Sequence, residues 1–484
     1  MIEKNELPTG WCSTDLGDII SPSKEKIEPV KTESIPYIGL EHIEKDTGKL
    51  LSFGNSTEVT STKTVFHKGD LLYGKLRPYL NKVCVTEIDG ICSTDILVFN
   101  EQRFLSNKLL KYRMLCPDFV RYANQNATGV NHPRVDFKKI ASFEIALPPL
   151  AEQHRIVAKI EELFTQLDAG VEALKKAKEQ IKQYRQAVLE SAFNGKLTEK
   201  WRLSSKEYIA PISEFISNVQ KTRSTDGKTV CDQLESTLEM PNGWLGVLLY
   251  QIADIGTGAT PLRSNKNYYE NGTIPWITSS AVNSQYITKA DEFITELAIK
   301  ETNAKIFPKN SLIIALYGEG KTRGKVSELL IEAATNQACA AIIFNDQTVV
   351  LKPFIKLYFQ KNYEDLRKLA SGGVQPNLNL GIIKSTLIPL PPLAEQEIIV
   401  GEIEKKFPIM EDIEKTIDQS LSYSETLRQS ILSQAFSGKL VPQNPNDEPA
   451  EKLLERIRAE RLNQAAGKPQ NSGPRRTRKQ ATLA

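Results

Sequence analysis

Two stretches of the chain place apolar residues at alternating intervals of four and three, the spacing of a helix that packs along a seam. The first series runs Ile156, Ile160, Leu163, Leu167, Gly170, Leu174, Ala177, Ile181, Tyr184, Val188, Ser191. The second runs Ile399, Ile403, Lys406, Met410, Ile413, Ile417, Ser420, Ser424, Leu427, Ile431. Both patterns predict a long amphipathic helix, and the second is the less regular. A lone helix of this type exposes its seam to water, so we expect the two seams to be buried against each other.

Proline and glycine mark the ends of both predicted helices. Pro148-Pro149 and Pro391-Pro392 precede the helices, and Gly195 and Gly438 follow them. Proline is favoured at the start of a helix and glycine just after its end. Each helix then has roughly 44 residues and a length of about 65 Å.

The two helices belong to a tandem repeat. Three short motifs occur twice, and the motifs that bracket the helices are separated by the same number of residues in both copies. The matched motifs are LPPLAEQ at 147–153 and 390–396, AF-x-GKL at 192–197 and 435–440, and LPTGW at 7–11 with MPNGW at 240–244. Duplicated units are usually related by a pseudo-twofold axis, which would lay the two helices antiparallel.

A β-rich globular segment lies ahead of each helix. Both segments contain an Ile-Pro-aromatic-Ile element, at 35–38 and 274–277, and an apolar run that ends at a glycine. These runs, LLYGKLRPYLNKV at 71–83 and IIALYGEGKTRGKV at 313–326, predict strand, loop and strand. The globular segments differ in length and in most of their sequence, whereas the helices agree in length. The pattern therefore predicts an α+β protein in which a constant frame carries two different heads.

The repeat divides the chain into six segments. A short amphipathic element follows each long helix, formed by Ile212, Phe215, Ile216 and Val219 in the first copy and by Ala450, Leu453, Leu454 and Ile457 in the second. The expected segments are head 1 (1–146), a long helix (147–197), a linker with a short amphipathic helix (198–239), head 2 (240–389), a second long helix (390–440), and an amphipathic helix with a basic, polar tail (441–484).

Composition narrows the class of protein. The chain has 484 residues, 40% of them hydrophobic and 25% charged, with a formal net charge of +3, values typical of a globular protein. No apolar run is long enough for a transmembrane helix, and the N-terminus lacks the features of a secretory signal. The six cysteines form no CxxC pair, which favours reduced thiols in a cytoplasmic protein.

The doubled pattern resembles the specificity subunits of type I restriction–modification systems, and the resemblance covers essentially the whole chain. It rests on the GW opening, LPPLAEQ leading into a long helix, and the AF-x-GKL helix end. It implies two target-recognition domains, each reading half of a split site in double-stranded DNA, joined by two conserved helices packed as an antiparallel coiled coil. It further implies a non-catalytic subunit that docks two methyltransferase subunits and, through them, restriction subunits. Two unlike heads predict an asymmetric target.

Basic loops at matching places in the two heads are the first candidates for DNA contact. Arginine pairs with guanine and lysine neutralises phosphate, although charged hairpin tips are also common. The candidates are Lys75, Arg77, Tyr79 and Lys82 in head 1, and Lys321, Arg323 and Lys325 in head 2.

A second pair of polar loops lies just ahead of each LPP motif, TGVNHPR at 128–134 and GGVQPN at 372–377. Asparagine, glutamine and arginine can bond to base edges, but asparagine and proline are also ordinary turn residues. The candidates here are Asn131, Arg134, Gln375 and Asn377.

Catalytic and cofactor motifs are missing from the sequence. Ala315–Thr322 fits a relaxed phosphate-loop pattern, but a phosphate loop must open a helix and a strand pattern follows instead. The histidines (His42, His67, His132, His154) lack metal-ligand spacing. Asp95 and Glu101 have no lysine cluster beside them and are interpreted as structural. We expect neither a bound cofactor nor a metal.

Two rival interpretations remain open. A protein–protein scaffold with two unlike heads would keep the paired helices but bind no DNA. An enzyme fused to its own specificity domains is disfavoured, because the two repeats use the full length and the catalytic motifs are missing.

Overall fold

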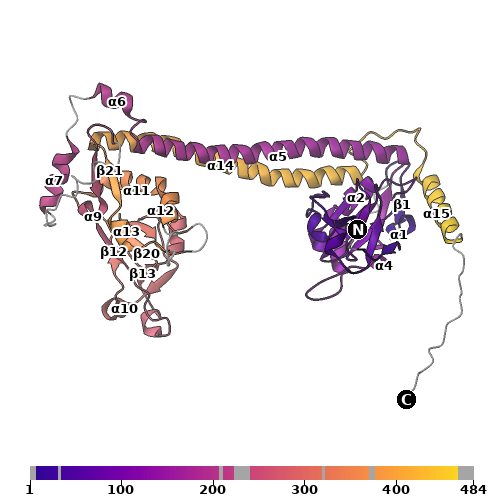
Figure 1. The fold of residues 1–484 in the computed structure, drawn as a ribbon, viewed down its shortest axis with the longest axis horizontal. Coiled ribbons are helices and arrows are strands. Elements are labelled where there is room, and N and C mark those ends of the chain that lie inside the picture. Colours follow the sequence, from indigo (N-terminus) through magenta and orange to yellow (C-terminus); the bar gives the residue numbers. More distant parts are fainter. Residues whose placement is uncertain are drawn as a thin grey trace, which may run out of the picture. The chain divides into compact units, whose positions relative to one another are not determined.

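The computed structural model describes residues 7–30, 34–205, 211–222, 240–318, 322–369 and 377–466. The chain forms two compact units (Figure 1). Unit 1 joins the chain up to Lys175 with the chain from Asp418 onward, and unit 2 holds Lys176–Ile417. Each unit therefore contains one head together with part of each long helix, and combines segments that the sequence repeat keeps apart.

Unit 1 consists of head 1, the start of the first long helix and the C-terminal helical segments. Its strands are β1 (Cys12–Asp15), β2 (Lys26–Ile27), β3 (Pro36–Ile38), β4 (Gly54–Asn55), β5 (Lys63–Phe66), β6 (Leu71–Gly74), β7 (Val83–Val85), β8 (Gly90–Cys92), β9 (Ile96–Phe99) and β10 (Glu144–Leu147). Its helices are α1 (Leu16–Ile19), η1 (Leu40–His42), η2 (Ser56–Glu58), η3 (Pro78–Leu80), α2 (Asn107–Met114), α3 (Pro117–Gln125), α4 (Phe137–Ile140), the start of α5 (Leu150–Phe193), the end of α14 (Leu393–Phe436) and α15 (Ala450–Ala466).

The strands within the described residues of head 1 form three sheets. Strands β2-β5-β8-β3-β4 make a five-stranded sheet, β7-β6-β9 a three-stranded sheet, and β1-β10 an antiparallel pair. In that pair Cys12 lies opposite Leu147, so the first and last strands of the head meet where α5 begins.

Unit 2 repeats this plan with different lengths. Its strands are β11 (Leu245–Leu248), β12 (Asp254–Thr257), β13 (Ile274–Ile277), β14 (Tyr286–Ile287), β15 (Glu292–Ile294), β16 (Ile306–Phe307), β17 (Leu312–Ala315), β18 (Val326–Leu329), β19 (Ala333–Thr335), β20 (Cys339–Ile343) and β21 (Leu387–Leu390). Its helices are the end of α5, α6 (Glu199–Ser204), α7 (Ile212–Thr222), α9 (Leu249–Ile252), η4 (Lys266–Tyr268), η5 (Ser279–Asn283), α10 (Glu296–Glu301), η6 (Val349–Leu351), α11 (Lys352–Lys361), α12 (Tyr363–Leu369), α13 (Leu380–Lys384) and the start of α14.

The sheets of head 2 correspond to those of head 1 in their closing pair and in one parallel pairing. Strands β12-β20-β17-β18-β14 and β15-β13-β19-β16 form two sheets, and β11-β21 forms the closing antiparallel pair. The Ile-Pro-aromatic-Ile strands β3 and β13 each run parallel to one strand, β8 and β19 respectively. The prediction of an α+β repeat with two unlike heads is confirmed.

The short helix after each long helix packs on the opposite repeat's head. In unit 1, Leu453, Leu454 and Ile457 of α15 belong to the same buried core as Trp11 of head 1. In unit 2, Ile212 and Ile216 of α7 belong to the core of head 2. The predicted apolar faces of these helices are buried, apart from the partly buried Phe215.

The two long helices are packed together and antiparallel within each unit. In unit 1, Arg155 near the start of α5 pairs at 2.5 Å with Asp447, which follows the end of α14. Asp168, further along α5, pairs with Arg428, which precedes Asp447 in the chain, so the two segments run in opposite directions. In unit 2, Arg185 lies 3.6 Å from Glu411. Both helices begin directly after their Pro-Pro pair and end just before their glycine. The prediction of an antiparallel helix pair is confirmed.

Burial of the predicted seam is incomplete. Ile156, Ile160, Ile399 and Ile403 are fully buried, because the heads cover these first turns of each helix. In contrast, Tyr184, Ile413 and Leu427 are 55%, 44% and 36% exposed. One partner helix covers only part of the apolar face of another, so the expected burial of the two seams against each other does not extend to these positions.

The tryptophan of the GW motif is bonded to the glutamate of LPPLAEQ. Trp11 Nε1 donates to Glu152 Oε2 at 3.0 Å, and Trp244 Nε1 donates to Glu395 Oε2 at 3.1 Å. The following glutamine is buried in both copies, and its side-chain amide donates to the carbonyl of the first motif proline, at 3.0 Å for Gln153 and 2.8 Å for Gln396. The duplicated motifs are therefore the joints between heads and helices.

Glycines Gly195 and Gly438 complete these joints. Both have positive φ, +73° and +72°, and an added Cβ would lie 2.3 Å from Pro241 Cγ and 2.4 Å from Pro8 Cγ. Only glycine fits such a left-handed turn against a proline ring. The end of each long helix is thus seated on the turn that opens the other repeat.

Candidate nucleic-acid interface

The two candidate loops of head 1 lie side by side. The Arg77 N–H donates to the carbonyl of Pro133 at 2.6 Å, and the Val135 N–H donates to the carbonyl of Lys75 at 3.0 Å. Leu76 and Arg134 form an isolated antiparallel bridge. The basic loop after β6 and the polar loop before α4 therefore form one surface.

Arg77 is held in an unusual conformation at the centre of this surface. Its φ is +52°, in the left-handed region that a side chain with a Cβ rarely adopts. Its Nη2 lies 3.5 Å from His132 Nδ1, and its Nε is buried without a hydrogen-bond partner in the described chain. The hydrogen bond from the Arg77 N–H to Pro133 helps to hold this backbone conformation.

Arg134 forms a two-point ion pair with Asp95. Its Nε and Nη2 donate to the two carboxylate oxygens at 2.9 and 3.2 Å. The Arg134 hydrogen bond holds the pKa of the Asp95 carboxyl below its usual range. Asp95 belongs to the turn between β8 and β9, and its carbonyl accepts from the Lys75 N–H at 2.9 Å. A third loop therefore joins the same surface.

The other candidates of head 1 differ in how far they are free to bind. Tyr79 is 47% exposed and Asn131 is exposed. Lys82 donates from its ammonium to the carbonyl of Leu40 at 2.6 Å. This hydrogen bond holds the Lys82 ammonium against its own head, so Lys82 is less available to bind a phosphate.

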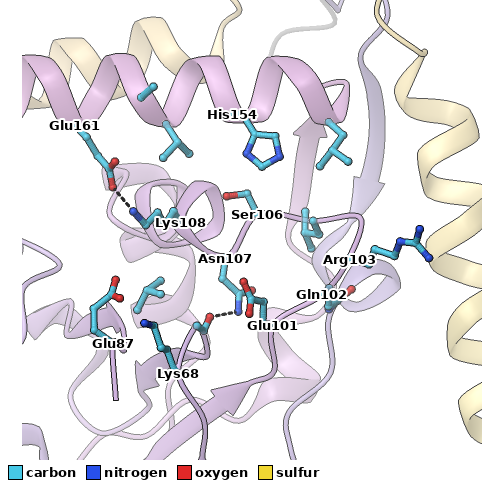
Figure 2. Close-up of a pocket in the computed structure, with 16 residues that line it drawn as sticks. Lys68, Glu87, Glu101, Gln102, Arg103, Ser106, Asn107, Lys108, His154 and Glu161 are labelled. Atoms are coloured by element: carbon cyan, nitrogen blue, oxygen red, sulfur yellow. Dashed lines mark hydrogen bonds and ion pairs between the residues drawn. The ribbon is translucent and has the colours of Figure 1, made fainter. Parts of the chain in front are cut away.

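The surface lies at the ends of β6 and β9 opposite to those that face the start of α5. Lys75 follows β6 and Asp95 precedes β9, whereas Lys68 precedes β6 and Arg103 follows β9. Lys68 and Arg103 line a cavity of about 1040 Å³ that His154 of α5 also lines (Figure 2). The candidate loops are consequently directed away from the helix joint.

The equivalent loops of head 2 are brought together in the same way. The Leu378 N–H donates to the carbonyl of Leu316 at 3.2 Å, and the Leu316 N–H donates to the carbonyl of Ala338 at 2.8 Å. Asn377 is exposed beside this contact. The candidates Lys321 and Gln375 lie outside the described residues.

Arg323 and Lys325 lie in the described part of the loop between β17 and β18, just before β18 begins. Arg323 is half-buried, with a buried Nε that has no partner among the described residues. Lys325 donates to Asn283 Oδ1 at 2.8 Å. Like Lys82 in head 1, Lys325 is partly engaged by its own head.

The phosphate-loop pattern at Ala315–Thr322 belongs to a strand-to-strand connection. Strand β17 ends at Ala315 and β18, its antiparallel neighbour, starts at Val326. A phosphate loop must lead into a helix whose N-terminus faces the phosphates. The strand that follows here supports the rejection of nucleotide binding.

Sequence reasoning overlooked part of this surface. The sequence pattern suggests a structural role for Asp95 and gives His132 no role beyond excluding a metal site, yet both contact candidate arginines. In head 2, Gln337 accepts a hydrogen bond from Thr260 and lies in the turn that corresponds to that of Asp95. The available signal is that the turns after β8 and β19 occupy the same place in both copies and carry polar residues in each.

Four of the described cysteines are deeply buried. Burial raises the pKa of Cys84, Cys92, Cys116 and Cys339 to about 12, which disfavours a nucleophilic thiolate. In the described chain, no group of three or more His, Cys, Asp or Glu side chains could hold a metal ion. Likewise, no described helix is long and apolar enough to cross a membrane.

The sequence matches one protein-family model twice. The model of the type I restriction modification DNA specificity domain matches residues 8–183 and 241–423. The chain is 27% identical to the EcoBI specificity subunit of Escherichia coli, over 73% of this chain and 72% of that protein. It is 29% identical to the EcoKI specificity subunit of E. coli K12, over 67% of this chain and 66% of that protein.

Other alignments vary in extent. The alignment with the EcoDI specificity subunit of E. coli, 28% identical, spans 46% of this chain and 50% of that protein. This chain therefore spans only half the length of that relative.

Two solved structures share the fold. A chain from a type I restriction–modification assembly has a TM-score of 0.70 and 21% identity, over 90% of this chain and 100% of that chain. The HsdS subunit of Thermoanaerobacter tengcongensis has a TM-score of 0.55 and 20% identity, over 90% and 99%. Both family matches include a GW opening, an LPPLAEQ joint and the start of a long helix. The chain belongs to the family of type I restriction–modification specificity subunits, the DNA-target-recognition components of those systems.

Proposed function

We propose that each head binds one half of an asymmetric, bipartite target in double-stranded DNA. The observation that carries this proposal is the convergence of the candidate loops at equivalent places in both heads. In head 1 these loops place Lys75, Arg77 and Arg134 together. The two heads share a topology but differ in the residues of these loops, so they suit two different half-sites.

The candidate residues divide between phosphate and base contacts. Lysines and tyrosine hydroxyls suit the DNA backbone, whereas arginine, asparagine and glutamine suit base edges. The proposed contacts are Lys75, Arg77, Tyr79, Lys82, Asn131, Arg134, Lys321, Arg323, Lys325, Gln375 and Asn377. Asn131 and Arg134 are the strongest of the described set, because they belong to the converging loops and are exposed, while Arg77 belongs to the same loops and is half-buried.

We propose that the long helices dock two methyltransferase subunits and, through them, restriction subunits. Helix α14 exposes Ile409 and Tyr423 by 61% and 66%, in addition to Ile413 and Leu427. Large exposed apolar residues repeated along one helix are typical of an interaction surface. The chain itself then recognises DNA without catalysing a reaction, needs no cofactor, and acts in the cytoplasm without a membrane.

We propose that the six segments expected from the sequence are the functional domains of the chain and the segments that connect them. We propose that 1–146 and 240–389 are the target-recognition domains, that 147–197 and 390–440 are the conserved helices, and that 198–239 and 441–484 are connecting segments. The closing pairs β1-β10 and β11-β21 lie at the head boundaries and support these limits.

The experiment is a methylation assay on a randomised double-stranded DNA library. The chain is combined with the methyltransferase subunits of its own system, and modified adenines are mapped by sequencing. We expect one asymmetric motif in two parts with a constant spacer, and no methylation or cleavage by the chain alone.

Methylation without a defined motif would overturn the proposal, and turnover by the isolated chain would overturn the non-catalytic role. The rival scaffold predicts that the chain binds the methyltransferase subunits but shows no salt-dependent affinity for DNA. A titration of the complex with duplex DNA at several salt concentrations separates the two.

A further inference from the structure

The ion pair between Arg134 and Asp95 has the geometry of a buttressed base-reading arginine. The carboxylate engages Nε and Nη2, which form the side edge of the guanidinium. The other edge, formed by Nη1 and the second hydrogen of Nη2, makes no hydrogen bond within the described chain. This free edge is the one that donates two parallel hydrogen bonds to O6 and N7 of guanine.

The backbone beneath Arg134 is fixed independently of the ion pair. Arg134 and Thr128 exchange two backbone hydrogen bonds, at 2.8 and 2.9 Å, which close the loop between them. Leu76 pairs with Arg134 on the other side. The loop is therefore closed without Asp95, and the carboxylate orients the side chain rather than holding the loop shut.

The pair is accessible from solvent. The side chains of Arg134 and Asp95 are 47% and 25% exposed. Within the same loop Val130 is 98% exposed and Asn131 is exposed. Arg134 thus combines a fixed backbone, an oriented guanidinium and a side chain that is about half exposed. Because its conformational entropy is already reduced, binding a base would cost less.

We propose that Arg134 reads a guanine in the half-site bound by head 1, and that Asp95 is a positioning residue that sets the specificity of this contact. The inference rests on the proposed function and deepens it. Asp95 accepts both guanidinium hydrogen bonds and leaves the second edge available to a base. It also disfavours guanidinium orientations that would contact a phosphate, because its charge repels the DNA backbone.

The turn that carries Asp95 differs between the heads, and this difference supports a role in specificity. The turn in head 1 reads Ser93-Thr94-Asp95, whereas its counterpart in head 2 reads Asn336-Gln337-Ala338. The aspartate has no acidic counterpart in head 2. A residue needed only by the shared fold would be expected in both heads.

The test compares Arg134→Lys and Asp95→Asn in the complex with methyltransferase subunits, assayed by motif mapping on a randomised double-stranded DNA library. Lysine keeps the charge but loses the two-pronged geometry. We expect Arg134→Lys to reduce the preference for guanine at one position roughly tenfold to a hundredfold. Asp95→Asn should reduce the preference at that same position about threefold to tenfold, while the other half-site stays unchanged.

Arg103→Ala is the matched control, because Arg103 follows the opposite end of β9 and is also exposed. It should leave base preference unaltered. Thermal unfolding of each variant checks that head 1 remains folded, since a folding defect would lower methylation at all sites without changing preference at one position.

The outcomes separate this inference from the proposed function. A defined motif in the wild type, with loss of guanine preference at one shared position in both variants, supports the inference. A defined motif that neither variant alters overturns it and leaves the proposed function standing. No defined motif in the wild type overturns both.

Discussion

Trp11 and Glu152 are joined by a buried hydrogen bond of 3.0 Å between the indole Nε1 and the carboxylate Oε2. The bond links the motif that opens head 1 to the first turn of α5. In unit 2, Glu395 accepts from Trp244 and also from Thr198 and Arg202, at 2.7 Å from Thr198 Oγ1 and 3.0 Å from Arg202 Nε. In unit 1, Glu152 Oε1 is buried and has no partner among the described residues. The two joints therefore differ in how well their buried carboxylate is satisfied.

Trp11→Phe should destabilise unit 1 more than Trp244→Phe destabilises unit 2. The first change leaves Glu152 without a hydrogen bond to either oxygen, while Glu395 keeps Thr198 and Arg202. We expect a loss of about 1–3 kcal/mol for the first variant, the cost of an unsatisfied buried polar group, and a smaller loss for the second. Hydrogen exchange in β1 and β11 measures each joint separately. Equal losses would contradict the difference between the two carboxylates.

The contribution of Glu152 to the stability of unit 1 should fall as pH rises above the ordinary pKa of a glutamate, about 4.3. Burial raises the pKa of Glu152, and Asp447 raises it further, against the lowering by the Trp11 hydrogen bond and by Arg155. A raised pKa in the folded state means that the folded chain binds a proton more readily, so its contribution to stability is lost as pH rises through the folded pKa. Glu152→Gln should remove this contribution. Denaturant titrations of both proteins across this range give the difference, and parallel pH profiles would contradict the assignment.

Val441→Thr should stabilise unit 1. Val441 follows Gly438 by the same three positions as Thr198 follows Gly195, and both glycines form the same turn against a proline. A threonine hydroxyl at 441 can donate to the unpartnered Glu152 Oε1, as Thr198 does to Glu395, for a gain of about 1 kcal/mol. The reverse change, Thr198→Val, is the matched control and should destabilise unit 2. Thermal unfolding checks both, and a lower midpoint for Val441→Thr at neutral pH would refute the equivalence.

Leu454→Ala should destabilise the N-terminal head although it lies in the C-terminal helix α15. Leu454 is buried in the same core as Trp11, and truncating a buried leucine costs about 2–5 kcal/mol. Hydrogen exchange should increase in α1 and β1 of unit 1 and stay constant in β11 of unit 2. Ile216→Ala in α7 is the corresponding change for unit 2 and should give the opposite pattern.

Arg77→Ala should weaken DNA binding by the complex and, because a positive charge is lost from the interface, reduce the salt dependence of its affinity by up to about one unit of slope. Lys321→Ala should act in the same way through head 2, as the sequence predicts. Lys68→Ala, at the opposite end of β6, serves as the control. Unaltered affinity and slope in both loop variants would show that these loops are not the DNA contact.

Local patterns alone allowed much of this architecture to be predicted from the sequence. The helix seam, the proline starts and the glycine ends depend on residues three or four positions apart, and α5 and α14 begin and end where these signals place them. The duplicated motifs predicted the repeat, and the apolar faces around Ile212 and Leu453 predicted the short helices. Such features are set by spacing along one element, which a single sequence records.

Tertiary structure decided which segments meet. No periodicity predicts that Thr198, after the first long helix, bonds to Glu395 at the start of the second. Nor does it predict that Asp95 and Arg134, from separate loops, form one ion pair. Such contacts depend on how strands pair and helices pack across the chain, and an antiparallel helix pair necessarily brings the end of one repeat to the start of the other. The sequence by itself therefore determined the elements and their repetition, and packing between distant segments decided the joints and the candidate DNA surface.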